Sequence, residues 1–437
     1  ETAGEEGLFS GRTTYFLWEN GEGSLSRNPS ARIQGLGAWG RDCVIVERTG
    51  AFKARLSVGD VHAQNCVALV PKSNELLPTI LSFVQSEAFR GQLKKLADKL
   101  ILPTGIFLQT KLELDVWAKA ASKSFSSGLP EPMSYNPNNW LFSGHPENCE
   151  DWAAIHVALA RLCGYRWPAE NDPSLRLSDV ARSWVEKSKN LPEGDNDGLL
   201  GVPAVAGEKP LADRLRAFLA LAFGKDWSDG LEQRLVAAAD KKLDRKSARD
   251  GSLEAWLRER AFRQHCIMFD QRPFLWHISD GLKDGFSVFV HYHRFDQANL
   301  RKLTYTLLGD WLARAKAEGN TLRFEKGREL QQKLEAILGG EKPYDIFVRW
   351  KSLAQQPLGW DSNLDDGVRQ NIRPFILAGV LTHKLDKTLK DKDRGKDVRS
   401  APWYDVFKGE RRNDHHTTLA EKRAAREAAA RRVEASR

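Results

Sequence analysis

The sequence predicts an α+β fold in which a β-rich region comes first and a mostly helical region with a β-hairpin follows. Three observations lead to this prediction. Between residues 35 and 70, short stretches rich in β-branched residues are separated by Gly, Asp and Pro. Over residues 151–271, apolar residues recur at helical spacing. At residues 272–293, two stretches of alternating apolar residues flank the turn sequence GLKDG.

The β-rich region is expected to form strands over CVIVE, FKARLSV and CVALV, and then a helix within residues 77–100. The residues expected on the apolar face of this helix are Leu81, Val84, Phe89, Leu93 and Leu96. After the helix, residues 101–114 are expected to return to extended structure. A small β-unit with polar loops at its rim favours a surface-reading module over a catalytic barrel.

A glycine-rich stretch within this region fits the pattern GxGxxG, as Gly35-Leu36-Gly37-Ala38-Trp39-Gly40. The pattern binds a dinucleotide only where a strand precedes the glycines and a helix follows them. Here the strand CVIVE follows the glycines, and a polar stretch precedes them. The glycines are therefore expected to form a turn rather than a nucleotide site.

The helical region holds several sets of potential metal ligands. They are His156 with Cys163, then His277, His291 and His293, and finally Asp361, Asp365 and Asp366. None of the sets has the further ligands that zinc or calcium sites require, so no metal site is predicted. His156 and Cys163 are expected in the core, whereas structural and DNA-facing roles both remain open for the hairpin histidines.

The remaining helical segments are expected in order along the chain. A polar loop is predicted at residues 190–210, and two long helices at residues 298–319 and 325–340. Residues 359–375 are expected to be a loop that leads into a short helix. Residues 417–437 predict a helix that is polar nearly all round and exposed to solvent.

Composition narrows the class of protein. The net charge of +8 over 437 residues is compatible with a polyanionic partner. The 5 cysteines show no CxxC spacing, which argues against a disulfide framework and against structural zinc. No apolar run is long enough to span a membrane, and no leader-like segment opens the sequence, so a cytoplasmic location is expected.

Several blocks together resemble a known family. The order of VHAQN, VPK, FVQSEAFRGQL and TGIFLQTKLEL resembles the target-recognition domains of adenine-specific DNA methyltransferases. Further blocks, among them LPEPMSYNPNNWLFSGHP and GWDSNLDDGVRQNIRPF, are similar to the C-terminal half of large type IIG-like methyltransferases. Those enzymes belong to bacterial phage-defence systems of the BREX and DISARM kind.

The resemblance implies a domain order and a function. It implies a target-recognition domain at 1–115, a linker at 116–150, a mostly helical domain at 151–400 and a basic helical tail at 401–437. The chain would be the specificity portion of an S-adenosylmethionine-dependent adenine-N6 methyltransferase, in a restriction-modification or phage-defence system. Its partners would be double-stranded DNA and either a methyltransferase catalytic domain or other subunits of the defence system.

Motifs for methyl transfer are not recognised in the sequence. Methyltransferases of this class hold the target amine with Asn/Asp-Pro-Pro-aromatic, and Asn136-Pro137-Asn138-Asn139 lacks the second proline and the aromatic residue. Nor does a glycine loop stand in the strand context that S-adenosylmethionine binding needs. We therefore predict no catalytic residue and no cofactor on this chain, and expect the donor to bind the complete enzyme.

Candidate DNA contacts are basic residues and amides of the recognition region. They are Arg32, Lys53, Arg55, Gln64, Asn65, Lys94, Lys95 and Lys99. Lysines and loop arginines bind phosphates, while Gln and Asn can pair with adenine through two hydrogen bonds. Alternatively, the two amides serve the backbone of the β-unit, and the lysines form a solvated face.

Two other functions remain open. The chain could be a protein-interaction subunit of a defence complex without its own DNA reading. It could also be an intact enzyme whose motif is not recognised. Salt-dependent binding to duplex DNA separates the first alternative from target recognition, and donor binding by the isolated chain would support the second.

Overall fold

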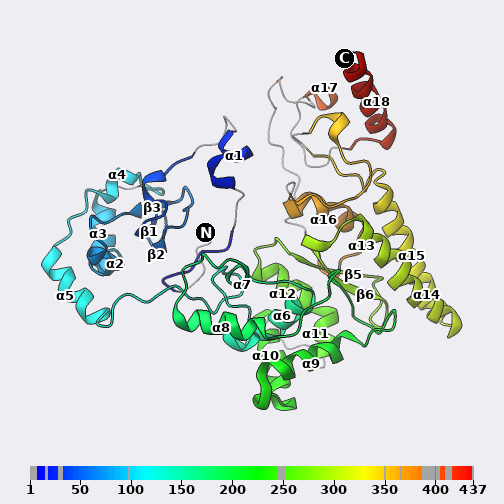
Figure 1. Ribbon diagram of the computed structural model, residues 1–437, viewed down its shortest axis with the longest axis horizontal. Coiled ribbons are helices and arrows are strands. Elements are labelled where there is room, and N and C mark those ends of the chain that lie inside the picture. The colour runs from blue at the N-terminus through cyan, green and yellow to red at the C-terminus, as the bar shows by residue number, and fades with distance from the viewer. Residues whose placement is uncertain are drawn as a thin grey trace. The chain divides into compact units, whose positions relative to one another are not determined.

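The computed structural model is an α+β protein whose chain divides into two compact units (Figure 1). Unit 1 comprises Glu1–Gly144 and Trp167–Ser188, and unit 2 comprises His145–Arg166 and Lys189–Arg437. The structure describes residues 7–14, 18–27, 33–96, 99–243, 251–348, 351–364, 367–385, 399, 404–408 and 416–435. Residues 116–144, which were expected to be a linker, belong with the β-rich region in unit 1.

Unit 1 is built on an antiparallel sheet of three strands in the order β2-β1-β3. The strands are β1 (Asp42–Glu47), β2 (Ala54–Val58) and β3 (Cys66–Leu69), as the sequence predicts. β1 pairs on both sides, with Val46 opposite Ala54 on β2 and Glu47 opposite Cys66 on β3. Both edges of this β-branched central strand are therefore satisfied by backbone hydrogen bonds.

One face of the sheet packs on helices α2 (Leu77–Val84) and α3 (Glu87–Leu96). The sequence predicts a single helix here, but Ser86 interrupts it, since its hydroxyl accepts a hydrogen bond from the Phe89 amide at 3.1 Å. The predicted apolar face is buried at all positions but the last, where Leu96 is 39% exposed. The core of unit 1 thus forms between alternate strand residues and this helix pair.

The prediction of extended structure at residues 101–114 is wrong. The segment contains α4 (Thr104–Phe107) and leads into α5 (Leu114–Ser124), which packs on α2. The indole of Trp117 lies 5.5 Å from the ring of Phe83, between ring centroids. Tertiary packing of this kind overrides the weak strand propensity of a short apolar run.

The glycine-rich stretch forms a turn, as expected. Gly35 has φ of 77° and begins the short 3₁₀ helix η2 (Leu36–Ala38), and Gly40 has φ of 71°. The Gly40 amide donates to the Gly59 carbonyl at 3.0 Å, and a Cβ on Gly59 would lie 2.8 Å from the Gly40 Cα. Glycine is needed where the two backbones cross this closely.

The other described elements of unit 1 are short, except for α8. They are η1 (Glu19–Gly21), α1 (Ser24–Arg27), η3 (Asn74–Leu76), α7 (Pro168–Asn171) and α8 (Asp179–Lys189).

Unit 2 is mostly helical, as predicted. Before its hairpin it contains η4 (Pro146–Asn148), α6 (Asp151–Leu162), α9 (Leu211–Phe223), η5 (Gly224–Asp226), α10 (Asp229–Leu243), α11 (Leu253–Glu259) and α12 (Ala261–Met268). After the hairpin come η6 (Tyr292–Arg294), α13 (Gln297–Arg301), the π-helical η7 (Lys302–Leu307), α14 (Leu308–Ala317), α15 (Thr321–Gly339), η8 (Leu353–Gln355), α16 (Gly367–Ala378), α17 (Tyr404–Phe407) and α18 (Leu419–Ala435).

The hairpin is confirmed, as β5 (Leu275–Ser279) and β6 (Ser287–His291). A third strand, β4 (Leu199–Gly201), joins β6 from a segment that the sequence predicts to be loop. Every residue of β6 is buried, so both faces of this sheet are covered. The sequence around β4 predicts a loop because it contains several Gly and Pro residues, and the strand itself is only three residues long.

Several histidines of unit 2, among them His156, His265 and His277, lie in the interior, whereas His293 is exposed. His265 Nε2 accepts the amides of Phe274 and Leu275 at 3.0 and 2.9 Å, and its Nδ1 lies 2.7 Å from His156 Nε2. His277 bonds Thr382 at 3.0 Å and stacks on Phe289. These bonds assign structural roles to His156, His265 and His277.

Two further potential metal ligands of unit 2, Cys163 and Asp361, form hydrogen bonds within the protein. The expected core position of Cys163 is confirmed, because its thiol lies buried against the Gly198 carbonyl at 3.3 Å. Asp361 accepts the Gln297 amide at 2.9 Å, at the start of α13, while Asp365 and Asp366 lie outside the described residues. Among the residues that the structure describes, no three potential ligands come together as a metal site.

The C-terminal helix α18 is exposed at most of its described positions, as the sequence predicts, but one of its lysines is buried. Lys422 is fully buried and donates to the Ile346 carbonyl at 3.1 Å. The buried carboxylate of Asp345 accepts the Thr417 amide at 2.9 Å and contacts His416 at 2.5 Å. One face of the helix is therefore fixed to the segment before η8.

In the described part of the chain, no helix combines the length and apolar character needed to cross a bilayer.

Acid should destabilise unit 2 through its buried histidines. Burial lowers the pKa of His156, His277 and His291 to about 3 each, below about 6.5 in an unfolded chain. The unfolded chain then takes up protons first, so stability is lost as pH falls from about 6.5 toward 3. We expect a loss of about 2 kcal/mol per histidine between pH 7.5 and 5.

Urea unfolding at a series of pH values measures this loss. His277→Gln keeps an amide for Thr382 and removes the titrating group, so its stability should depend less steeply on pH. A free energy of unfolding that stays constant from pH 7.5 to 5 would contradict the assignment.

Candidate nucleic-acid interface

The antiparallel order of unit 1 brings three chain segments to one end of its sheet. β1 ends at the edge of the sheet where β2 and β3 begin. The residue that follows β1 therefore lies beside the residues that precede β2 and β3. The Glu47 amide donates to the Lys53 carbonyl at 3.0 Å, and the Arg48 amide to the Asn65 carbonyl at 2.9 Å. We call Arg48, Lys53, Gln64 and Asn65 the sheet-end surface.

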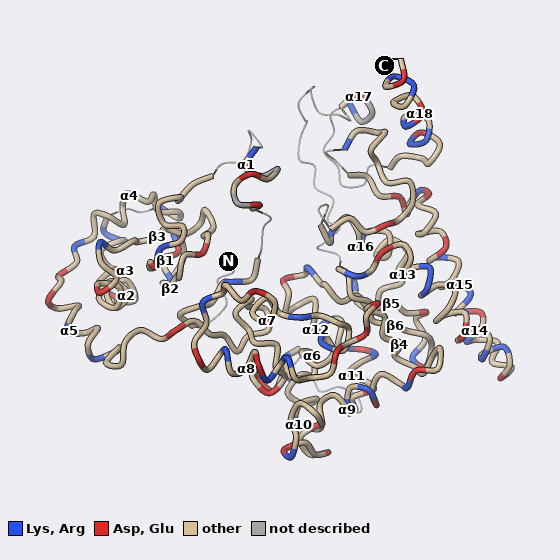
Figure 2. Tube along the Cα trace, viewed as in Figure 1, with Lys and Arg blue, Asp and Glu red and all other residues tan. Residues whose placement is uncertain are grey.

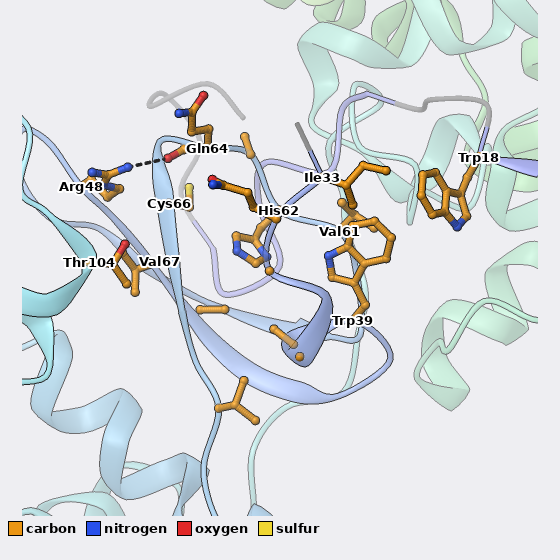
Figure 3. Close-up of a pocket in the computed structure, with 17 residues that line it drawn as sticks. Trp18, Ile33, Trp39, Arg48, Val61, His62, Gln64, Cys66, Val67 and Thr104 are labelled. Carbon is orange, nitrogen blue, oxygen red and sulfur yellow. Dashed lines mark hydrogen bonds between the residues drawn. The ribbon is translucent and has the colours of Figure 1, made fainter. Parts of the chain in front are cut away.

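Arg48 fastens this surface together. Its Nε donates to the Leu102 carbonyl at 2.8 Å, and its Nη1 donates to the Gln64 carbonyl at 3.1 Å (Figure 3). The Leu102 amide returns a hydrogen bond to the Arg48 carbonyl at 3.0 Å. The segment after α3, which begins with Lys99, is thereby held at the same end of the sheet. The sequence analysis missed Arg48, although a cation directly after the strand CVIVE was a visible signal.

The residues predicted to contact DNA differ in their exposure. Gln64, Asn65, Lys94, Lys95 and Lys99 are exposed, and Lys53 is half-buried. The backbone carbonyls of Gln64 and Asn65 accept the bonds from Arg48, and the Asn65 Oδ1 accepts a hydrogen bond from the Cys66 thiol at 3.6 Å. Arg32 lies outside the described residues. Their contact with DNA stays a prediction.

Arg55 lies where a base-reading role is difficult. Its side chain is 4% exposed, and its Nη2 lies 3.2 Å from the carboxylate of Glu47. Contact with a base would require Arg55 to leave this buried ion pair, which is costly. The geometry therefore favours a structural role for Arg55, in contrast to the exposed residues that are predicted to contact DNA.

A hollow of about 640 Å³ lies beside the sheet-end surface, within unit 1 (Figure 3). Its aromatic residues are Trp18, Trp39 and His62, and its polar residues include Arg48, Gln64 and Thr104. The indoles of Trp18 and Trp39 meet edge to face, with centroids 5.1 Å apart. Cys66 and Ala68, from the sheet face opposite α2, also line the hollow.

The turn glycines give the hollow its shape. A Cβ on Gly35 would lie 2.9 Å from the His62 ring, so glycine allows the turn to approach this side chain. The sequence analysis recognised the turn but not the aromatic residues that the turn brings together. The motif GLGAWG and the segment VHAQN each carry one of them.

Charge is not concentrated on one unit. Figure 2 shows Lys and Arg interspersed with Asp and Glu along most helices of both units. In α3, Lys94 and Lys95 occupy the last turn, five and four residues before Lys99. Many other surface cations are paired with carboxylates, as Arg176 is with Asp42 at 2.8 Å. Any polyanion site in unit 1 therefore depends on local groups rather than on net charge.

Comparison with known proteins gives a partial match. No protein-family model matches the sequence. Over 208 residues the chain is 26% identical to the adenine-specific methyltransferase BrxX of Escherichia coli O9:H4 (strain HS). The match covers 43% of this chain and 16% of that protein. The similarity supports a relation to adenine-specific methyltransferases, as the sequence blocks predict.

Replacing Arg55 tests whether it is structural. Arg55→Ala should lower the free energy of unfolding by roughly 3 kcal/mol, because it leaves Glu47 buried and unpaired. Arg41→Ala, at an exposed arginine of the same unit, should change it by less than about 0.5 kcal/mol. Urea unfolding and DNA affinity are both measured. A larger loss of affinity for one recognised sequence than for random DNA, with unchanged stability, would show base reading instead.

Proposed function

We propose that this chain is the DNA target-recognition portion of an adenine-N6 DNA methyltransferase in a restriction-modification or phage-defence system. Methyl transfer from S-adenosylmethionine would be performed by a domain outside this chain. The single observation that carries the proposal is the sheet-end surface. It presents cations and amides from three separate segments on one rigid support.

The chemistry of this surface suits duplex DNA. Lys94, Lys95 and Lys99, which are exposed outside the sheet-end surface itself, can bind phosphates, which contribute affinity without regard to sequence. Gln64 and Asn65 carry amides, which offer the donor and acceptor that adenine N7 and N6 require. The backbone that carries both amides is hydrogen-bonded to Arg48, so this part of the loop is held before DNA arrives. Preorganised groups of this kind lower the entropic cost of binding.

The distant similarity to BrxX supports the proposal, because BrxX is described as an adenine-specific methyltransferase. We propose target recognition rather than methyl transfer for this chain because the sequence shows no recognised motif for methyl transfer.

A protein-interaction role is the second candidate, and exposed apolar side chains favour it. Leu100 is 86% exposed, Leu108 79%, Ile101 55% and Val116 54%, all within one stretch of unit 1. Side chains of this kind commonly mark protein contacts. A methyltransferase domain could cover them while the sheet end binds DNA, so the two roles are compatible.

Salt-dependent binding to duplex DNA tests the proposal. Fluorescence anisotropy of a labelled duplex should show affinity that falls steeply with salt. Replacing Lys94, Lys95 and Lys99 with Ala should weaken binding about equally for all sequences. It should also flatten the salt slope by roughly one unit for each lost phosphate contact.

The matched control replaces Lys111, Lys119 and Lys123, which are also exposed lysines of unit 1 and lie near or on α5. This variant should keep the slope of the unaltered chain. Absence of duplex binding at low salt would reject target recognition and favour the protein-interaction role. Equal losses in both triple variants would reject α3 as the phosphate-binding helix.

A further inference from the structure

The hollow beside the sheet-end surface has a composition that restricts its ligand. The lining includes the aromatic rings of Trp18, Trp39 and His62 and the guanidinium of Arg48. None of the described residues that line it is Asp or Glu. Aromatic sites for ammonium groups bind a cation through ring faces, and a guanidinium in the lining opposes such a ligand. A flat ligand that is neutral or carries a nearby anion fits better.

Size and hydrogen-bonding groups narrow the choice. A volume of about 640 Å³ is within the range of small-molecule sites. The ring of Trp39, which is half-buried, offers an aromatic surface to a flat ligand. Gln64 and Thr104 add an amide and a hydroxyl to the lining. Planar heterocycles with several acceptors, such as nucleobases, match this set.

We propose that the hollow receives one unpaired nucleobase of a DNA strand, a role that rests on the proposed DNA binding. The base stacks on Trp39, Gln64 and Thr104 offer hydrogen bonds to its edge, and the Arg48 guanidinium faces the attached phosphate. A base must leave the duplex to enter, so a site with a base already unpaired should bind more tightly than a fully paired one.

A bulged duplex tests the proposal with the full chain. The probes are a duplex with one bulged 2-aminopurine and the same duplex fully paired, both read by anisotropy and by 2-aminopurine fluorescence. The chain should prefer the bulged duplex and should change the fluorescence of its bulged base by stacking. Trp39→Ala should lose roughly 5- to 150-fold in affinity for the bulged duplex, as expected for one stacked base. Its affinity for the paired duplex should change little.

Controls separate stacking from folding. Trp39→Phe keeps an aromatic face and should retain most of the preference, whereas Trp39→Leu keeps apolar bulk and should lose it. Trp184→Ala, at a half-buried tryptophan of α8 outside the hollow, should bind both duplexes as the unaltered chain does. Thermal unfolding of each variant checks that unit 1 still folds.

The outcomes distinguish this proposal from the proposed function. Equal affinity of the unaltered chain for both duplexes, without a fluorescence change, would overturn the base site and leave target recognition intact. Loss of affinity by Trp39→Leu for both duplexes alike would also overturn it. Failure to bind either duplex would overturn both proposals. Displacement of the bulged base by S-adenosylmethionine would reassign the hollow to the methyl donor.

Discussion

The pairing of β1 with strands on both sides is the constraint on which unit 1 depends. It turns Val44 and Val46 toward α2 and α3 and leaves the opposite face to the aromatic hollow. A shift of one residue would exchange these faces, because successive side chains alternate across a strand. The same register brings the end of β1 beside the starts of β2 and β3. Core packing and the assembly of the sheet-end surface therefore have one common cause.

In unit 2, by contrast, polar side chains such as those of His265 and His277 form hydrogen bonds inside the structure. Its sheet is covered on both faces, His265 accepts a backbone amide beside it, and His277 on β5 bonds Thr382. Burial holds the pKa of His156 and His277 near 3, so both are neutral at physiological pH and poorly placed to exchange protons with a substrate. We regard unit 2 as support, and the exposed polar groups of unit 1 as the part that faces a partner.

Patterns of period two and 3.6 predicted much of the fold, including the strands of unit 1, the hairpin and the order of helices in unit 2. They failed at α4 and β4, where tertiary contacts decide the structure of short or mixed segments. The exposure of Gln64 and Lys94 agrees with the expected surface. The burial of Arg55 and the joining of Trp18, Trp39 and His62 could not be predicted, because each depends on contacts between residues distant in sequence.

The central claim, that the sheet-end surface is where the chain meets DNA, is tested most directly by hydrogen exchange of the full chain with and without duplex DNA. Binding should slow exchange in peptides covering residues 48–53, 60–66 and 99–104. Peptides covering β5 and β6 should exchange as before. Protection confined to unit 2, or no protection in the three segments at saturating DNA, would contradict the claim.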